Sequence, residues 1–175
     1  MSRLQFIRDL VAKRGYISSM TKKDGLENLI KGENCDIQEG VIIGMDGFGY
    51  EQNEFGVYEK FPHYGKIILG DNVDVYAPTV LIRGSVHDTE IGNGTKIAGN
   101  CQIGHNCKIG KNCLIGPFVC IGGTSDIGDN VKIGQFVYIA HGIKIGSNCR
   151  ISSFTMVTKD IPAGSKIRGI PGELI

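Results

Sequence analysis

An isoleucine recurs at every sixth position across the middle of the chain, and this period constrains the fold more than any other feature. The isoleucines stand at positions 91, 97, 103, 109, 115, 121, 127, 133, 139, 145 and 151. The next residue is nearly always glycine, alanine or serine, and the residue four positions after each isoleucine is small or β-branched. A period of six fits neither an α-helix nor a free-standing hairpin. The chain must therefore wind around an axis as short β-segments joined by tight turns.

Three six-residue sides make a triangular coil of 18 residues, in which the isoleucines and the small residues point inward and stack from coil to coil. An asparagine recurs three residues after its isoleucine, where a turn needs the left-handed conformation that asparagine tolerates. These asparagines are Asn100, Asn106, Asn112, Asn130 and Asn148. We therefore predict an all-β fold, a parallel β-helix of hexapeptide repeats.

The composition fits one such domain and excludes several classes of partner. The chain has 175 residues with 26 glycines, and the repeats account for that excess. A net charge of +1 gives no reason to expect nucleic acid or an anionic membrane. No apolar run reaches the length of a membrane span, and the first residues do not resemble a signal peptide. We expect a cytoplasmic protein without a membrane span.

The cysteines are expected to be buried, reduced thiols. Four of the six lie in the inward column of small residues, where cysteine acts as a small hydrophobe. These four are Cys101, Cys107, Cys113 and Cys149. Because the spacing of zinc-binding cysteines is absent, we predict no metal site.

The chain divides into a cap, a solenoid and a closing loop. Residues 1–34 are predicted to form a short N-terminal helical cap, with an amphipathic helix at 2–14 and a second short helix around 26–31 as one option for an ambiguous stretch. A partner-binding helix is the alternative to a cap. The repeats are expected at 35–158, with an inserted loop at 46–66. Residues 159–175, rich in proline and glycine, are predicted to form the closing loop.

The inserted loop and a slip in the repeat phase are the two irregularities. The loop carries six aromatic residues, which either pack on the solenoid or a neighbouring subunit or form a flap that stacks on a substrate ring. Between residues 82 and 91 the phase slips by four positions, which predicts a bulge at one corner.

Three of the four histidines fall near one outward column of the coil. His105, Gly123 and His141 are each 18 residues apart, and His87 lies 18 residues before His105, although the slip makes its place uncertain. Strands about 4.8 Å apart would put His141 about 10 Å along the axis from His105. A lone surface histidine is usually inert, but a row of them suits proton abstraction near neutral pH.

Several motifs resemble one acyltransferase family. They are DGFG at 46–49, RGxxxDT at 83–89, QIxHN at 102–106 and MVTKDIPAG at 156–164. Together they resemble the acyltransferase domain of UDP-3-O-(3-hydroxyacyl)glucosamine N-acyltransferase over about two thirds of the chain. The resemblance implies that the β-helix is left-handed. A homotrimer is predicted separately, because so short a solenoid has a thin interior and the outward histidine column needs a second wall to become a cleft.

The resemblance also implies roles for individual residues. His105, the histidine of QIxHN, would be the general base, and the backbone N–H of Gly123 would stabilise the oxyanion. Residues expected to bind the acceptor are Asp46, Phe48, Tyr50, Arg83, Asn106 and His141. Residues expected to bind the acyl donor are Gly123, Lys159, Lys166 and Arg168. Phe154 and Met156 would border the acyl group.

Three departures from the family suggest a different acceptor. The family carries a uridine-binding domain where this chain has residues 1–34, its DRG motif is here Ile82-Arg83-Gly84, and its second histidine aligns with Gly142. We therefore expect a relative that acylates another amino sugar, nucleotide-linked, in cell-surface polysaccharide or lipopolysaccharide synthesis. The donor would be acyl-CoA, such as acetyl-CoA, or an acyl carrier protein, and no cofactor would be bound permanently.

Three other functions remain open at this point. One is an O-acyltransferase of the same fold, and another is a non-catalytic trimeric scaffold. The third is a γ-carbonic-anhydrase-like zinc protein. His105 and His141 have the spacing of two of its zinc ligands, but Gly146 stands where the third would be.

Overall fold

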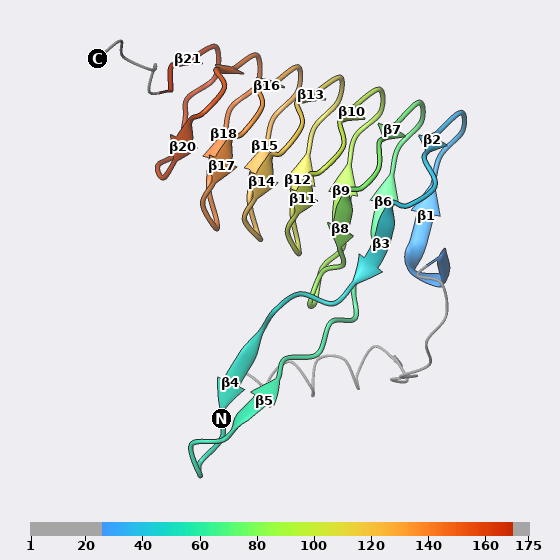
Figure 1. The fold of residues 1–175 in the computed structure, drawn as a ribbon, viewed down its shortest axis with the longest axis vertical. Helices are drawn as coiled ribbons and strands as arrows, with labels where there is room; N and C mark the ends of the chain where they lie inside the picture. Colours follow the sequence, from blue (N-terminus) through green and yellow to red (C-terminus); the bar gives the residue numbers. More distant parts are fainter. Residues whose placement is uncertain (1–25, 170–175) are drawn as a thin grey trace.

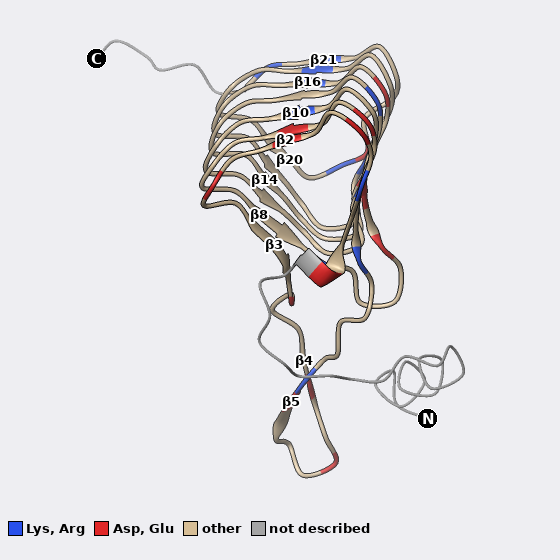
Figure 2. Cartoon of the chain, turned by 90° about the vertical axis from the view of Figure 1, so that its right-hand side faces the viewer, with Lys and Arg blue, Asp and Glu red and all other residues tan. Residues whose placement is uncertain are grey.

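The chain forms a triangular solenoid from which one hairpin extends (Figure 1). The computed structural model describes residues 26–169. Within this part of the chain no helix has the length and apolar character to cross a membrane. Each side of the triangle is a parallel sheet that runs along the axis, and the view in Figure 2 shows the triangular outline.

Three sheets make the three sides. Sheet A contains β1 (Leu29–Lys31), β6 (Ile67–Leu69), β9 (Thr89–Ile91), β12 (Lys108–Ile109), β15 (Asp126–Ile127) and β18 (Lys144–Ile145). Sheet B contains β2 (Asp36–Ile37), β7 (Asp74–Val75), β10 (Lys96–Ile97), β13 (Leu114–Ile115), β16 (Lys132–Ile133), β19 (Arg150–Ile151) and β21 (Lys166–Ile167). Sheet C contains β3 (Ile42–Met45), β8 (Val80–Ile82), β11 (Gln102–Ile103), β14 (Cys120–Ile121), β17 (Tyr138–Ile139) and β20 (Met156–Val157).

The predicted repeat is confirmed in register and burial. Strands pair 18 residues apart, as Lys96 does with Leu114 and Leu114 with Lys132. All eleven isoleucines of the six-residue period are buried, and so is the whole column of small residues four positions after them. Each Å² of apolar surface that these side chains remove from water stabilises the fold by about 25 cal/mol. This burial is the main force that holds the coils together.

The asparagines stand at left-handed turn residues, as predicted. Each of the five has a φ between 53° and 62°. Phe118, Phe136 and Phe154 adopt the same conformation at the corner of Asn100, one, two and three coils further on. Their rings stack on one another with centroids 4.7 and 5.0 Å apart.

The four inward cysteines are buried and free, as predicted. Burial raises the pKa of the Cys107 thiol to about 12. Its Sγ lies 3.2 Å from the carbonyl oxygen of Gly122 on the next coil.

The inserted loop is a hairpin that stands away from the solenoid (Figure 1). Its strands are β4 (Tyr50–Gln52) and β5 (Tyr58–Lys60), which pair antiparallel. The ring of Phe48 is 96% exposed and that of Phe55 80% exposed. Within this one chain, these two rings therefore do not pack on the solenoid.

The strands reach beyond the predicted bounds of the repeats at both ends. The 3-10 helix η1 (Leu26–Asn28) is a single turn, and Leu29–Lys31 is strand β1 rather than part of a second short helix. At the other end, β21 pairs with β19 inside the expected closing loop. The predicted helix at 2–14 lies outside the described residues.

Candidate functional site

The predicted histidine column lies at the corner between sheets C and A. His105, Gly123 and His141 follow β11, β14 and β17, so they occupy the same turn position in three successive coils. The ring centroids of His105 and His141 are 5.8 Å apart, closer than two coil spacings. The rings can approach because Gly123, between them, has no side chain. Lys159 follows β20 and takes the same turn position one coil further on.

The ring of His105 is fixed in one tautomer by Asn106. Oδ1 of Asn106 lies 2.9 Å from Nδ1 of His105 and also accepts a hydrogen bond from the backbone N–H of Ser85 at 3.1 Å. The amide group of Asn106 donates to the carbonyl oxygen of His87 at 2.8 Å, so the positions of its oxygen and nitrogen are set. Nδ1 of His105 must therefore donate, which leaves Nε2 with the free lone pair of a neutral imidazole.

The bulge predicted from the phase slip supports this arrangement. Residues 83–88 leave the coil between β8 and β9, and Asn106 binds two of them through its side chain. The backbone of the bulge pairs with the end of the insert, since Tyr64 N–H donates to Ser85 and Gly65 N–H donates to Gly84. Asn106 was expected to bind the acceptor, but its side-chain oxygen and nitrogen are already engaged within the protein.

Gly123 presents an unpaired backbone N–H next to His105. A side chain at this position would place its Cβ 2.5 Å from Nε2 of His105, so any residue other than glycine would displace that ring. At the neighbouring corner the equivalent N–H groups are capped by the next coil: Lys111 N–H donates to Asp129 at 2.7 Å. Within the described residues, the N–H of Gly123 makes no such bond. It is therefore available to a ligand.

His141 is held in the opposite tautomer. The hydroxyl of Thr124 donates to the carbonyl oxygen of Gly123 at 2.7 Å and lies 3.0 Å from Nε2 of His141. Because that hydroxyl proton is already used, Nε2 of His141 is the donor and Nδ1 carries the lone pair. The side chain is exposed, as expected for the outward column.

A histidine that the sequence analysis did not single out completes the row. His63 comes from the end of the insert, and its ring centroid is 5.8 Å from that of His105, at an interplanar angle of 78°. The ring is buried, and this burial lowers its pKa. His87, which the spacing placed near the row, contributes its backbone carbonyl to Asn106 and keeps an exposed side chain.

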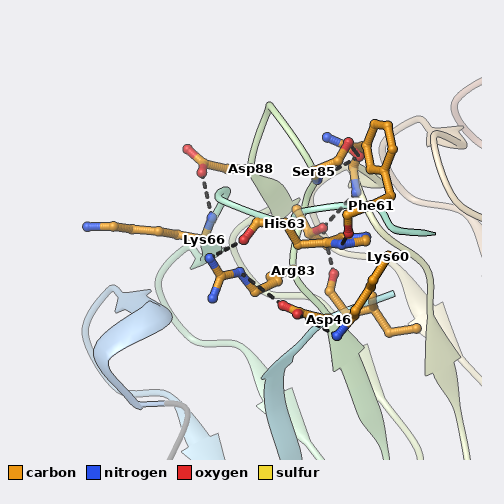
Figure 3. Close-up of polar contacts among 11 residues, drawn as sticks. Asp46, Lys60, Phe61, His63, Lys66, Arg83, Ser85 and Asp88 are labelled. Atoms are coloured by element: carbon orange, nitrogen blue, oxygen red, sulfur yellow. Dashed lines mark hydrogen bonds and ion pairs between the residues drawn. The ribbon is translucent and has the colours of Figure 1, made fainter. Parts of the chain in front are cut away.

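Asp46 and Arg83 hold His63 in place (Figure 3). Arg83 donates from Nη2 to the carbonyl oxygen of His63, and its Nε lies 3.8 Å from Oδ1 of Asp46. Lys60 lies 2.8 Å from the other oxygen of Asp46. Asp46 and Arg83 were both expected to bind the acceptor. In this structure they contact each other and residues of the insert.

The residues expected to bind the donor do not gather at one place. Lys159 continues the histidine row, whereas Lys166 is in β21 on sheet B and Arg168 follows it. Phe154 and Met156 do lie together, on a groove that they line with Phe136, Tyr138 and Thr155. Among residues 26–169, no three histidine, cysteine or acidic side chains are grouped so that they could hold a metal ion.

Sequence comparison identifies the repeats. Residues 88–123 and 124–159 match the family described as bacterial transferase hexapeptide (six repeats). UDP-3-O-acylglucosamine N-acyltransferase of Marinomonas sp. (strain MWYL1) is 45% identical over 65 residues, which are 37% of this chain and 19% of that protein. The enzyme of the same name from Shewanella denitrificans is 48% identical over 63 residues, or 36% of this chain and 18% of that protein. The matched part thus spans about a fifth of these relatives.

Structure comparison gives the same fold. UDP-N-acetylglucosamine acyltransferase of Francisella novicida superposes with a TM-score of 0.73 over 82% of this chain and 50% of that chain, at 24% sequence identity. At this identity the likeness shows the fold alone. Residues 88–159 therefore match the bacterial transferase hexapeptide repeat family, and the fold around them is the left-handed parallel β-helix.

Proposed function

We propose that this protein transfers an acyl group from a thioester to the amino group of a nucleotide-linked sugar. The observation that carries the proposal is that a histidine nitrogen with a free lone pair adjoins a glycine whose backbone N–H has no partner in the described part of the chain. Nε2 of His105 is free because Nδ1 is bound to Asn106, and it lies next to Gly123, whose backbone N–H has no partner among the described residues. Acyl transfer needs a base and an oxyanion donor in this relation.

In this proposal His105 moves one proton and Gly123 stabilises one charge. The amine nitrogen attacks the thioester carbon, and a C–N bond forms while negative charge collects on the carbonyl oxygen beside the N–H of Gly123. Nε2 of His105 takes the proton that the nitrogen sheds. The C–S bond then breaks, and the imidazolium returns the proton to the thiolate sulfur.

The choice of substrates rests on the relatives and on the groove at Phe154. Two curated relatives are named for acylating an amino sugar linked to UDP, which supports a nucleotide-linked amino sugar as acceptor in cell-surface polysaccharide or lipopolysaccharide synthesis. Phe154 and Met156 line an apolar groove on the other edge of sheet C, and we propose that they border a short acyl group from acetyl-CoA rather than a long one from an acyl carrier protein. We further propose a cytoplasmic homotrimer that holds no permanent cofactor.

A substrate panel tests this function. UDP-glucosamine, UDP-3-O-acylglucosamine and UDP-N-acetylglucosamine are each incubated with acetyl-CoA or an acyl carrier protein thioester, and products are identified by mass. We expect an N-acylated product from an acceptor with a free amine. A product from UDP-N-acetylglucosamine would indicate O-acylation instead. No product from any pair would contradict the proposal.

The His105→Ala variant tests the assigned base. Removal of a general base lowers kcat by about 10²–10⁴. We expect that loss with unchanged oligomeric state, because the side chain points out of the isoleucine stack. His141→Ala and His87→Ala are the matched controls, and both should cost less. If His105→Ala keeps more than about a tenth of wild-type kcat, the base is another residue.

A further inference from the structure

We propose that Nε2 of His63 accepts a hydrogen bond from the acceptor sugar, next to the group that is acylated. His63 would then be the residue of the insert that selects and orients the acceptor. The inference rests on the proposed function, since it names how that same site binds one of its two substrates.

The tautomer of His63 leaves Nε2 as an acceptor. Nδ1 lies 3.0 Å from the carbonyl oxygen of Phe61, and a carbonyl can only accept, so Nδ1 carries the proton. Nε2 has no hydrogen bond among the described residues. Of the side-chain polar atoms sealed from solvent there, only Nε of Arg83 lacks a hydrogen bond, so Nε2 of His63, which also lacks one, is not sealed from solvent.

The position of Nε2 is next to the base. Gly47, near the start of the insert, lies beside both imidazoles. A Cβ at Gly47 would lie 2.7 Å from Nε2 of His63 and 3.4 Å from Cδ2 of His105, which is bonded to the basic Nε2 of that ring. A single small space is therefore bordered by His63 on one side and by His105 on the other. A group bound to His63 would adjoin the group that His105 deprotonates.

The clamp around His63 fixes this geometry. The clamp consists of Asp46, Lys60 and Arg83, which come from the start of the insert, its second strand and the bulge. Lys60 and Arg83 both approach the carboxylate of Asp46, and Arg83 also binds the backbone of His63. Burying part of the arginine costs desolvation free energy. We infer that this cost is kept because the arginine positions a histidine whose Nε2 can bind a ligand. An apolar side chain would pack at this site without leaving a nitrogen unpaired.

Two amide substitutions distinguish the role of Nδ1 of His63 from that of Nε2. In His63→Asn the amide can take the place of Nδ1 and keep the bond to Phe61, while nothing replaces Nε2. In His63→Gln the amide reaches the place of Nε2 and loses the bond to Phe61. We measure kcat and KM with acetyl-CoA and the acceptor of the panel above that the wild-type protein turns over fastest, and the Kd of that acceptor by calorimetry.

We expect acceptor binding to weaken in His63→Asn and to stay near the wild-type level in His63→Gln. His63→Asn should raise the KM and Kd of the acceptor about tenfold, as loss of one hydrogen bond does, with the KM of acetyl-CoA unchanged. His63→Gln should stay within about threefold of wild type. A normal His63→Asn with an impaired His63→Gln would overturn the proposal and make His63 structural. Equal loss in both variants, or in neither, would overturn it as well.

A wild-type protein that acylates none of the panel would overturn the proposed function together with this inference, whereas active wild type with normal variants would overturn this inference alone.

Discussion

Gly123 shows how much one missing side chain matters to the site. It lets the ring of His105 approach the next coil, and its own backbone N–H has no partner among the described residues. Gly123→Ala should lower kcat by about 10²-fold, because the new Cβ would occupy a position 2.5 Å from Nε2 and displace the base. Steady-state kinetics measures the loss, and thermal unfolding should change little, since φ at this position is not in the left-handed region.

The double variant His105→Ala/Gly123→Ala separates this mechanism from a general disturbance. If alanine at 123 acts by displacing the imidazole, adding it to His105→Ala should lower kcat hardly further. Independent losses that multiply would mean that Gly123 contributes mainly through its N–H, or that the coil itself has changed.

At single positions, the sequence predicts the residues whose places follow from the regular coil. It does not predict the contacts made by the insert and the bulge. The left-handed turn residues, including Asn106, follow from the repeat because every coil places the same demand on the backbone. The row of His105, Gly123 and His141 follows for the same reason. The contact of His63 with His105 does not, because it depends on how the insert folds back, and a single histidine in an aromatic loop gives no period to recognise.

The insert and the bulge form one structural element, although the sequence presents them as two separate irregularities. The end of the insert pairs with the bulge through backbone hydrogen bonds from Tyr64 and Gly65. Arg83, in the bulge, approaches Asp46 at the start of the insert. The four extra residues of the phase slip thus provide the edge on which the insert rests. A repeat pattern predicts where it is broken but not what fills the break.

We expect the hairpin to bind the acceptor through its root more than through its tip. Phe48 is nearly fully exposed and directly follows Gly47, which lies beside both His63 and His105. Phe48→Ala should raise the acceptor KM by about three- to tenfold, the worth of one aromatic contact, with the donor KM unchanged. Kinetics with each substrate varied in turn measures both constants.

The matched control shortens the tip. Replacing residues 54–56 by Asn-Gly keeps the pairing of Asn53 with Val57 as a two-residue hairpin and leaves Lys60 and Phe61 in contact with the site. This change should raise the acceptor KM less than Phe48→Ala does. Equal effects of Phe48→Ala on both substrates, or none, would assign the exposed rings to packing against a neighbouring subunit.

At the scale of the whole molecule, the three faces of the solenoid differ in charge. The outward residues of sheets A and B include lysines, arginines and acidic residues along most of their length (Figure 2). The outward residues of sheet C form one paired ladder without a charge. They are Ile42, Val80, Gln102, Cys120, Tyr138 and Met156. The stacked phenylalanines border this face at one corner, and the histidine row borders it at the other.

An uncharged face of this length is typical of a surface that a second copy covers, and its edge carries the site. We therefore expect a homotrimer in which sheet C is buried and the histidine row lies at the rim of a cleft between subunits. Light scattering coupled to size exclusion measures the mass. A protein that stays monomeric at micromolar concentration and still turns over substrate would contradict this assembly.

Matched lysine substitutions on two faces locate the contact. Tyr138→Lys introduces a charge on sheet C in β17, next to the edge strand β20, where the tyrosine is 43% exposed in the single chain. Leu114→Lys introduces the same charge on sheet B, at a leucine that is 53% exposed between two lysines. A buried, unpaired charge costs several kcal/mol, so Tyr138→Lys should dissociate the trimer and lower kcat with it, since the cleft is lost. Leu114→Lys should leave both mass and kcat unchanged. If Leu114→Lys dissociates the assembly and Tyr138→Lys does not, the subunits meet through sheet B, and the histidine row has no second wall.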